Sequence, residues 1–289
     1  MASSILPTTT RNKFTEKEWD DEFGLNWYHF DWRPYDPQIG RFFSVDPQAI
    51  DFPSYSPYHY AYNNPLAFND PTGQSAEAVV EKDSSGNETG NVVVSANLIF
   101  YGSQATNKNA QAIAKEIQSL YNTARATITI NGKQYNVKFN ITSQVVSASV
   151  AAILAQNNTD IKNNFIRVEN QGATIRSEME LGGNAGYFVT SDKLGQSTTA
   201  SHEFGHGLGL PHSPENQIGQ GQPDIMAARG TLVDPKFQYA SNAKPGAPGG
   251  TLNPFLRAVL QKNVSDVFVN VHFTNGNARI GTLTNTIYK

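Results

Sequence analysis

The sequence predicts an α+β fold, in which a mixed sheet packs against helices and follows a short aromatic-rich segment of strands and turns. Runs that alternate apolar and polar residues, as strands do, are interleaved with runs in which apolar residues recur at helical spacing. Asn-Gly dipeptides at 131–132 and 275–276 separate pairs of strand-like runs, as in hairpins with type I′ turns. Before Gly73 the chain is instead rich in aromatic residues and in Asp-Pro and Asn-Pro turns.

The change of character near Gly73 predicts a domain boundary. Residues 1–73 hold more than half of the aromatic residues and all three Trp, which suits short strands and turns. Residues 74–91 are polar and contain a Gly/Ser-rich run at 83–87, a composition typical of a linker. We therefore predict a first segment over 1–73, a linker over 74–91 and a larger domain over 92–289.

The first elements beyond this linker are a strand, a helix and a hairpin. Apolar residues are nearly continuous over 91–101, as in a buried strand, and recur at helical spacing over 110–121. The next two runs, 126–130 and 134–141, alternate apolar and polar residues across Asn131-Gly132.

Shorter patterns predict the remaining elements. We expect a helix over 145–156, strands over 164–169 and 186–190, and a C-terminal hairpin formed by 267–273 and 279–287.

Composition excludes several classes of function. The 289 residues carry a net charge of -3 with no basic run, which argues against nucleic-acid binding. Because there is no cysteine, a bound metal must use imidazole or carboxylate ligands. Residues 1–13 lack the apolar core of a signal peptide, and the longest mostly apolar run, 145–155, is too short to span a bilayer. We expect no membrane span and no export signal within this chain.

Three closely spaced histidines have the pattern of a metal site. His202 and His206 are four residues apart, which on a helix places both imidazoles on one face. The threonines at 198–199 can cap the start of this helix. Gly209 can adopt the left-handed conformation that ends a helix, so that His212 returns to the same ion as third ligand.

This pattern predicts zinc as the cofactor. Three neutral imidazoles leave zinc a fourth position for water, whose pKa falls towards about 7. Glu203, next to His202, can take the proton of that water as general base and so direct it at a carbonyl. The other three histidines, His29, His59 and His272, have no partners at ligand spacing, and we interpret each as structural.

The histidine run resembles a known enzyme signature. His-Glu-x-x-His-x-x-Gly-x-x-His over 202–212 is similar to the long zinc signature of the metzincin metallopeptidases, and Ser213 is typical of their matrixin-like branch. Residues 224–227, Asp-Ile-Met-Ala, resemble the Met-turn beneath the metal. The resemblance implies a metzincin-like mixed sheet with an active-site helix and a Met-turn. It also implies that 183–186 precede or form the edge strand that aligns an extended protein or peptide substrate.

Positions 226 and 228 bear on this resemblance. Met226 alone suits a core position as well as a site floor, but its place fourteen residues after His212 favours the Met-turn. Some metzincins have Tyr two residues after this Met, where Ala228 stands here. The sequence therefore names no residue that stabilises the oxyanion.

The N-terminal segment carries a second resemblance. The run from Tyr35 to Phe42, followed by Ser-Val-Asp-Pro at 44–47, Tyr-Ala-Tyr-Asn-Asn-Pro at 60–65 and Asp-Pro-Thr-Gly at 70–73, is similar to the Rhs (YD-repeat) associated core domain. In such proteins the core closes a large β-shell, and a variable C-terminal domain, commonly a toxin, follows the last of these motifs. The resemblance implies an effector after Gly73, with the upstream Rhs shell and an immunity protein as partners.

Asp46 and Asp70 fit two interpretations. In some Rhs relatives an Asp pair at these motif positions cuts the effector free. Each Asp also suits an Asp-Pro turn, in which the carboxylate accepts bonds from nearby backbone amides. We favour the turn, because the residues after both motifs differ from the usual pattern.

Two functions remain to be compared. The first is an active zinc endopeptidase that acts on proteins as a secreted or surface-delivered effector. The second is a carrier or adhesion module whose zinc site is degenerate and only structural. Intact Glu203 and all three histidine ligands favour the peptidase, because a degenerate site is expected to lose its base early.

Overall fold

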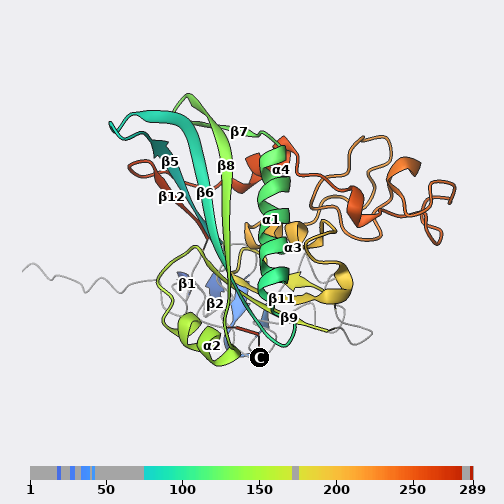
Figure 1. Cartoon of the computed structure of the whole chain (residues 1–289), viewed down its shortest axis with the longest axis horizontal. Coiled ribbons are helices and arrows are strands. Elements are labelled where there is room, and N and C mark those ends of the chain that lie inside the picture. Colours follow the sequence, from blue (N-terminus) through green and yellow to red (C-terminus); the bar gives the residue numbers. More distant parts are fainter. Residues whose placement is uncertain are drawn as a thin grey trace, which may run out of the picture. The chain divides into compact units, whose positions relative to one another are not determined.

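The protein has two structural units, Met1–Pro71 and Thr72–Lys289, and each is described by itself. The computed structural model describes residues 18–20, 27–29, 34–39, 41–42, 75–170, 176–281 and 287–288. Figure 1 shows the elements of both units in sequence colours.

The described part of the first unit is a small antiparallel sheet of short strands, as its composition predicts. Its strands pair in chain order: β1 (Glu18–Asp20), β2 (Trp27–His29), β3 (Pro34–Asp36) and β4 (Arg41–Phe42). Between β3 and β4, Asp36 Oδ1 accepts a 2.7 Å hydrogen bond from the backbone of Gln38. This is the local bond that favours turns at Asp-Pro sequences.

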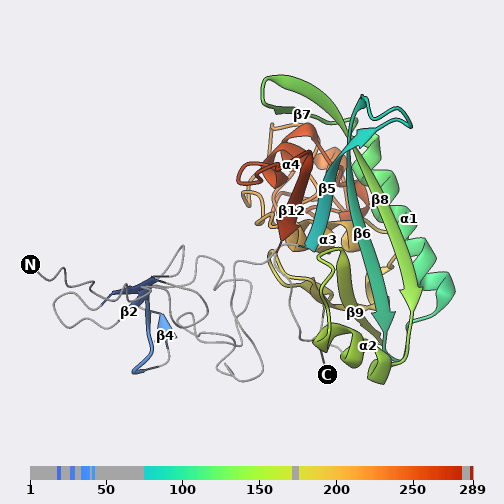
Figure 2. The same cartoon turned by 90° about the vertical axis from the view of Figure 1, so that its left-hand side faces the viewer.

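The second unit is built around β6 (Glu88–Tyr101), the strand predicted over 91–101. It pairs in parallel with β8 (Lys133–Val145) from Asn91 to Phe100. It also pairs antiparallel with β5 (Ser75–Lys82) and, from Asn97 onward, in parallel with β9 (Asn163–Glu169). One long strand therefore joins the two halves of the sheet (Figure 2).

The predicted linker over 74–91 is wrong. This segment forms β5, a tight turn and the first residues of β6, and both strands belong to the central sheet. In the turn, Asp83 Oδ1 accepts bonds from the backbones of Ser85 and Asn87, and Gly86 has a φ of 85°. Because turn-forming residues are the same in a hairpin and in a linker, composition alone could not separate the two.

Helices cover both faces of this sheet. α1 (Asn107–Thr123) begins at Thr106, whose side chain accepts a bond from the backbone of Asn109, and it buries Ile113, Ile117 and Tyr121 at helical spacing. These residues share one buried cluster with alternate residues of β6, Val92 to Phe100, and the ring of Tyr121 lies 4.7 Å from that of Phe139 in β8. α2 (Ala148–Gln156) packs instead on Ile99 and Tyr101, which point to the opposite face. Both helices match the ranges predicted for them.

The hairpin around Asn131-Gly132 is confirmed. β7 (Thr127–Ile130) pairs antiparallel with β8, and Asn131 and Gly132 have φ angles of 50° and 82°. Positive φ at both turn residues is the type I′ geometry.

The edge strand differs from the expectation at 183–186. β11 (Ala185–Val189) lies inside the sheet, paired in parallel with β9 on one side and antiparallel with β10 (Glu178–Met179) on the other. β10 is the terminal strand of this end among the described residues. Gly186 thus lies in an internal strand of the sheet. The apolar pattern of the sequence could not reveal which strand forms the edge.

The C-terminal hairpin is also wrong in part. The segment predicted as its first strand, 267–273, begins at the end of α4 (Gln261–Val267) and continues without a strand. The Asn275-Gly276 turn is present, with positive φ at both residues, and leads into β12 (Asn277–Gly281). β12 pairs with β5, so its partner lies about 200 residues earlier in the chain.

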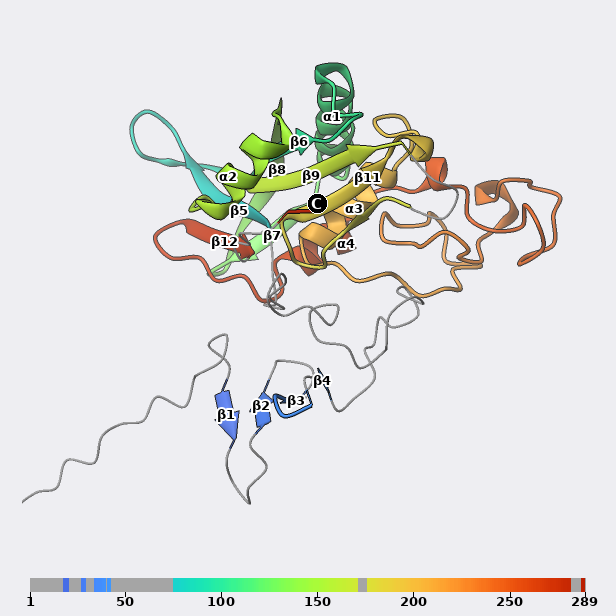
Figure 3. The ribbon, with the colours of Figure 1, turned by 90° about the horizontal axis from the view of Figure 1, so that it is seen from below.

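The helix that carries the histidine pair, α3 (Thr199–Gly207), packs against α1 through the rings of Phe204 and Tyr121, whose centroids are 5.6 Å apart and nearly perpendicular. Between α3 and α4 the chain forms an irregular lobe, orange in Figures 1 and 3, which contains the short 3-10 helices Pro235–Phe237 and Pro254–Leu256. A further 3-10 turn, Thr190–Asp192, precedes α3. Among the described residues, no helix is long and apolar enough to cross a membrane.

The position of β5 makes a testable prediction about where the second unit begins. A chain of residues 72–289 keeps every strand of the sheet and should unfold in one cooperative thermal transition. A chain of residues 92–289 loses β5 and the pairing partner of β12, together with the buried side chains of Ala76, Ala78 and Val80, and should not. Circular dichroism against temperature measures both. A cooperative transition in the shorter chain would show that residues 74–91 are not needed for folding, as a linker would not be.

Candidate metal centre

The start of α3 is held by residues from other elements. Ser197 Oγ accepts a 3.3 Å bond from the backbone of Thr199. Glu116 of α1 accepts bonds from Ser201 at both its backbone nitrogen, 3.2 Å, and its hydroxyl, 2.8 Å. A carboxylate at this end satisfies an otherwise unpaired N–H and complements the helix dipole. Thr198, predicted as a cap, makes no capping bond, because its hydroxyl donates to the backbone carbonyl of Pro254.

The end of α3 turns the chain back as predicted. Gly209 has a φ of 87°, its backbone N–H donates to the His206 carbonyl, and that of Leu210 donates to the Gly205 carbonyl. These two bonds form a Schellman motif, which requires the left-handed conformation that glycine tolerates. The reversal brings His212 back to the helix face that carries the other two histidines.

The three histidines lie together. The Nε2 atoms of His202 and His206 each lie 3.1 Å from Nε2 of His212. Among the described residues, these three are the group of His and acidic side chains close enough to hold one ion. In a tetrahedral site with Zn–N bonds of about 2.0–2.1 Å, ligand nitrogens are roughly 3.3–3.4 Å apart, so the observed spacing is nearly that of an assembled site.

The hydrogen bonds of the other ring nitrogens fix how these imidazoles face one another. Nδ1 of His202 lies 2.7 Å from the Ile225 carbonyl, and Nδ1 of His206 lies 2.8 Å from the Leu210 carbonyl. A carbonyl only accepts, so each Nδ1 carries the proton and each Nε2 presents a lone pair. Nε2 of His212, 3.1 Å from both of these atoms, completes a set of three ring nitrogens of the kind that binds zinc. The donor set therefore fits a metal ion, with the backbone orienting two of its ligands.

A tight turn, here called the site loop (residues 224–227), lies under α3. Its backbone carbonyl at Met226 accepts a 3.0 Å bond from Ser213, and the Ala227 N–H closes the turn on Asp224. Met226 is buried against Gly205, where any side chain would collide with its sulfur and approach the Tyr121 hydroxyl within 3.0 Å. Glycine at this point of α3 is what allows the site loop to approach so closely.

Glu203 is buried beside these ligands, with 7% of its surface exposed. Its pKa is raised to about 8, mainly by burial; the charge of Asp192 contributes to the rise, and Arg257 and Arg229 oppose it. Burial also lowers the pKa of His202 well below its ordinary value, which keeps the imidazole neutral. A divalent cation on the histidines would favour the ionised carboxylate, so metal binding and the proton on Glu203 are coupled.

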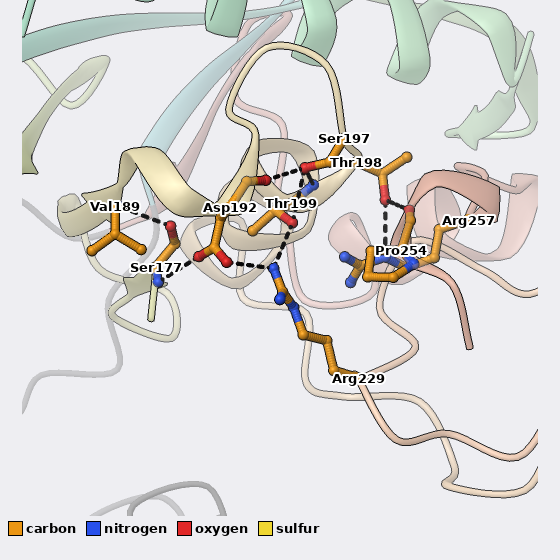
Figure 4. Close-up of polar contacts among 9 residues, drawn as sticks. All are labelled: Ser177, Val189, Asp192, Ser197, Thr198, Thr199, Arg229, Pro254 and Arg257. Atoms are coloured by element: carbon orange, nitrogen blue, oxygen red, sulfur yellow. Dashed lines mark hydrogen bonds and ion pairs between the residues drawn. The ribbon is translucent and has the colours of Figure 1, made fainter. Parts of the chain in front are cut away.

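Two arginines, which sequence patterns did not single out, join the start of α3 to the lobe (Figure 4). Arg229 donates a 2.6 Å bond to the buried Asp192 and contacts the hydroxyl of Thr199. Arg257 is almost fully buried and donates to the Thr198 hydroxyl, 2.9 Å, and to the carbonyl of Ala227 in the site loop, 3.1 Å. Isolated arginines have no spacing signal, so only the fold could show these contacts.

The other histidines and the two Asp residues of the N-terminal motifs either lie apart from this centre or fall outside the residues that the structure describes. His272 is exposed, and its imidazole is not part of the histidine group. His29 lies in β2, where its side chain is not described, while His59, Asp46 and Asp70 fall outside the described residues. Neither self-cleavage nor an Asp-Pro turn at the two Asp residues is therefore tested.

Comparisons with known proteins found limited similarity. No protein-family profile matches the chain. Over 68 residues it is 47% identical to salivary gland surface protein 1 of Aedes aegypti, a match that covers 24% of this chain and 2% of that protein. The solved structure of myroilysin aligns with a TM-score of 0.31 and 14% identity, over 67% of this chain and 98% of that one.

The geometry predicts that each histidine of the group contributes to metal binding. Replacing His202, His206 or His212 with Ala leaves two imidazoles, so zinc affinity should fall by at least about 100-fold. His272→Ala is the matched control and should bind like wild type. Competition with a chromophoric chelator measures the dissociation constants. Absence of zinc from the wild-type chain after exposure to the metal would contradict the assignment.

A second prediction concerns Glu116. Burial raises the pKa of its carboxyl to about 7, from an ordinary 4.5, so the folded state binds this proton more tightly than the unfolded state does. Its contribution to stability is fully present below pH 4.5 and is lost as the pH rises through about 7. Glu116→Gln keeps acceptors for Ser201 but does not titrate.

Between pH 5 and pH 8, the free energy of unfolding of wild type should therefore fall relative to that of Glu116→Gln. Urea denaturation of the two metal-free proteins at intervals of one pH unit measures this difference. Parallel curves for the two proteins would show that Glu116 does not titrate in this window.

Proposed function

We propose that this chain is a zinc-dependent endopeptidase whose metal is held by His202, His206 and His212. The observation that carries the proposal is the convergence of three Nε2 atoms, two of them oriented by backbone carbonyls, beside a buried carboxyl. When bound, zinc lowers the pKa of water and polarises the carbonyl that is attacked. A purely structural zinc site would not need a buried acid next to its ligands.

Glu203 has the role of general base in this proposal. It is adjacent to His202 on α3 but rotated about 100° from it, so it reaches the attacking water from the side and is not itself a ligand. Its burial gives it a high proton affinity, which suits a group that takes a proton from water and then delivers it to the leaving amine. The charges of Arg257 and Arg229 favour the ionised form of this carboxyl.

The order of elements supports a metzincin-like arrangement. The elements β6, α1, β8, β9, β10 and β11 precede α3 in that order. The turn that bears Met226 packs against Gly205 of α3 and accepts a bond from His202, as a Met-turn would. We assign the alignment of an extended peptide substrate to β10, the terminal strand at this end of the described sheet. Its neighbour β11 is paired with β9 along its whole length and with β10 at Gly186 and Tyr187.

The place of action is also a proposal. The motifs over 35–47, 60–65 and 70–73 resemble the Rhs core, and the metal centre lies after them in the chain. We therefore propose an effector that is secreted or delivered to a cell surface, with a protein or peptide substrate. An Rhs shell and an immunity protein are the expected partners. The relative matched over 68 residues is itself named a surface protein.

Glu203→Gln tests the catalytic assignment. The substitution keeps size and shape but removes the proton affinity, so zinc should stay bound while peptide hydrolysis falls by about two to four orders of magnitude. A quenched-fluorescent peptide library and the zinc content of the same sample measure the two effects. A chelator should abolish wild-type hydrolysis, and added zinc should restore it.

The outcomes separate the candidate functions. Zinc binding without hydrolysis in the wild-type chain would favour the carrier or adhesion module. Hydrolysis by Glu203→Gln at the wild-type rate would remove the role of general base, and loss of zinc from this variant would make Glu203 a structural residue.

A further inference from the structure

Asp224, the first residue of the site loop, is a buried carboxylate at the meeting point of three segments. Its two oxygens lie 2.8 and 2.7 Å from the hydroxyl of Ser213. Oδ1 also accepts a 2.8 Å bond from the backbone of Met226 and a 3.3 Å bond from the side-chain amide of Asn263, in α4. Only 8% of its surface is exposed, and these donors are all neutral.

These bonds hold the segments that orient two of the three histidines. Ser213 directly follows His212, so the bond to its hydroxyl holds the chain where that ligand enters the centre. Between Asp224 and Met226 lies Ile225, whose carbonyl accepts the Nδ1 proton of His202. The Ile225 carbonyl and the Met226 N–H belong to one planar peptide group, so the bond from this N–H to Asp224 fixes the direction of the carbonyl.

Burying a carboxylate that has no cationic partner among its bonds is unfavourable in free energy, since its desolvation is offset only by hydrogen bonds. Several hydrogen bonds can offset this desolvation at one point, because a carboxylate accepts up to about four bonds. Stabilising the turn alone would require only the bond from Met226. The additional bonds to Ser213 and Asn263 lead to the ligand segment and to α4.

We propose that Asp224 is a positioning residue of the metal centre, which orients His202 through the Ile225 carbonyl and His212 through Ser213. This inference rests on the proposed metal site but not on peptidase activity. It predicts that removal of the carboxylate weakens metal binding even where the fold is retained. Substitution of partners beyond the ligands typically lowers metal affinity by about 10–100-fold.

The test uses the full chain with zinc and cobalt as probes. Asp224→Ala should raise the dissociation constant for zinc by about 10-fold or more, and should alter the visible absorption of the cobalt form, which reports ligand geometry. Asp224→Asn should restore most of the affinity, because an amide oxygen can still accept the Met226 N–H and its amide nitrogen can donate to Ser213. Val94→Ala, a core change in the sheet, is the control, and should lower stability without changing the dissociation constant.

Ser213→Ala provides a second variant that keeps the site loop intact. It should weaken zinc binding several-fold, and combined with Asp224→Ala it should add little, because both remove the same bond. If Asp224→Ala does not fold, this variant decides. Unchanged affinity in either single variant, or equal weakening in Asp224→Ala and Asp224→Asn, would overturn the proposal. Failure of the wild-type chain to bind metal would instead overturn the proposed function.

Discussion

The arrangement of the metal centre depends on two hydrogen bonds from imidazole Nδ1 atoms to backbone carbonyls. They fix the tautomer of His202 and His206, so that lone pairs at Nε2 face His212. One carbonyl comes from Leu210, in the turn that ends α3, and the other from Ile225, in the site loop. The helix end and the loop are thus as much a part of the ligand geometry as the histidines are.

Holding these carbonyls in place requires the rest of the second unit. α3 lies between α1 and the site loop, with Tyr121 on one side and Met226 on another, and Gly205 is the residue that allows both to come close. α1 is in turn packed on β6 and β8, the longest strands of the sheet. The same packing buries Glu203, and the loss of water around its carboxyl is the cause of its raised pKa.

Elements with a strong local pattern could be predicted, and those defined by distant pairing could not. β6, α1 and the β7–β8 hairpin follow from apolar spacing and from an Asn-Gly turn, which are properties of neighbouring residues. The segment 74–91 has the composition of a linker, but its strands form because β6 and β12 lie on either side of β5. The order of β10 and β11 is likewise a property of the sheet and not of either strand.

The sequence by itself determined which residues can form the metal centre. A separation of four residues on a helix and one glycine able to adopt positive φ are enough to bring His202, His206 and His212 together. The tertiary structure alone decided what holds them: Glu116, from α1, occupies the start of α3 in place of the expected threonine caps, and Asp224 joins Ser213 to the site loop. The reason is physical, because a buried donor is satisfied by whichever acceptor folding brings within hydrogen-bond distance, at any separation along the chain.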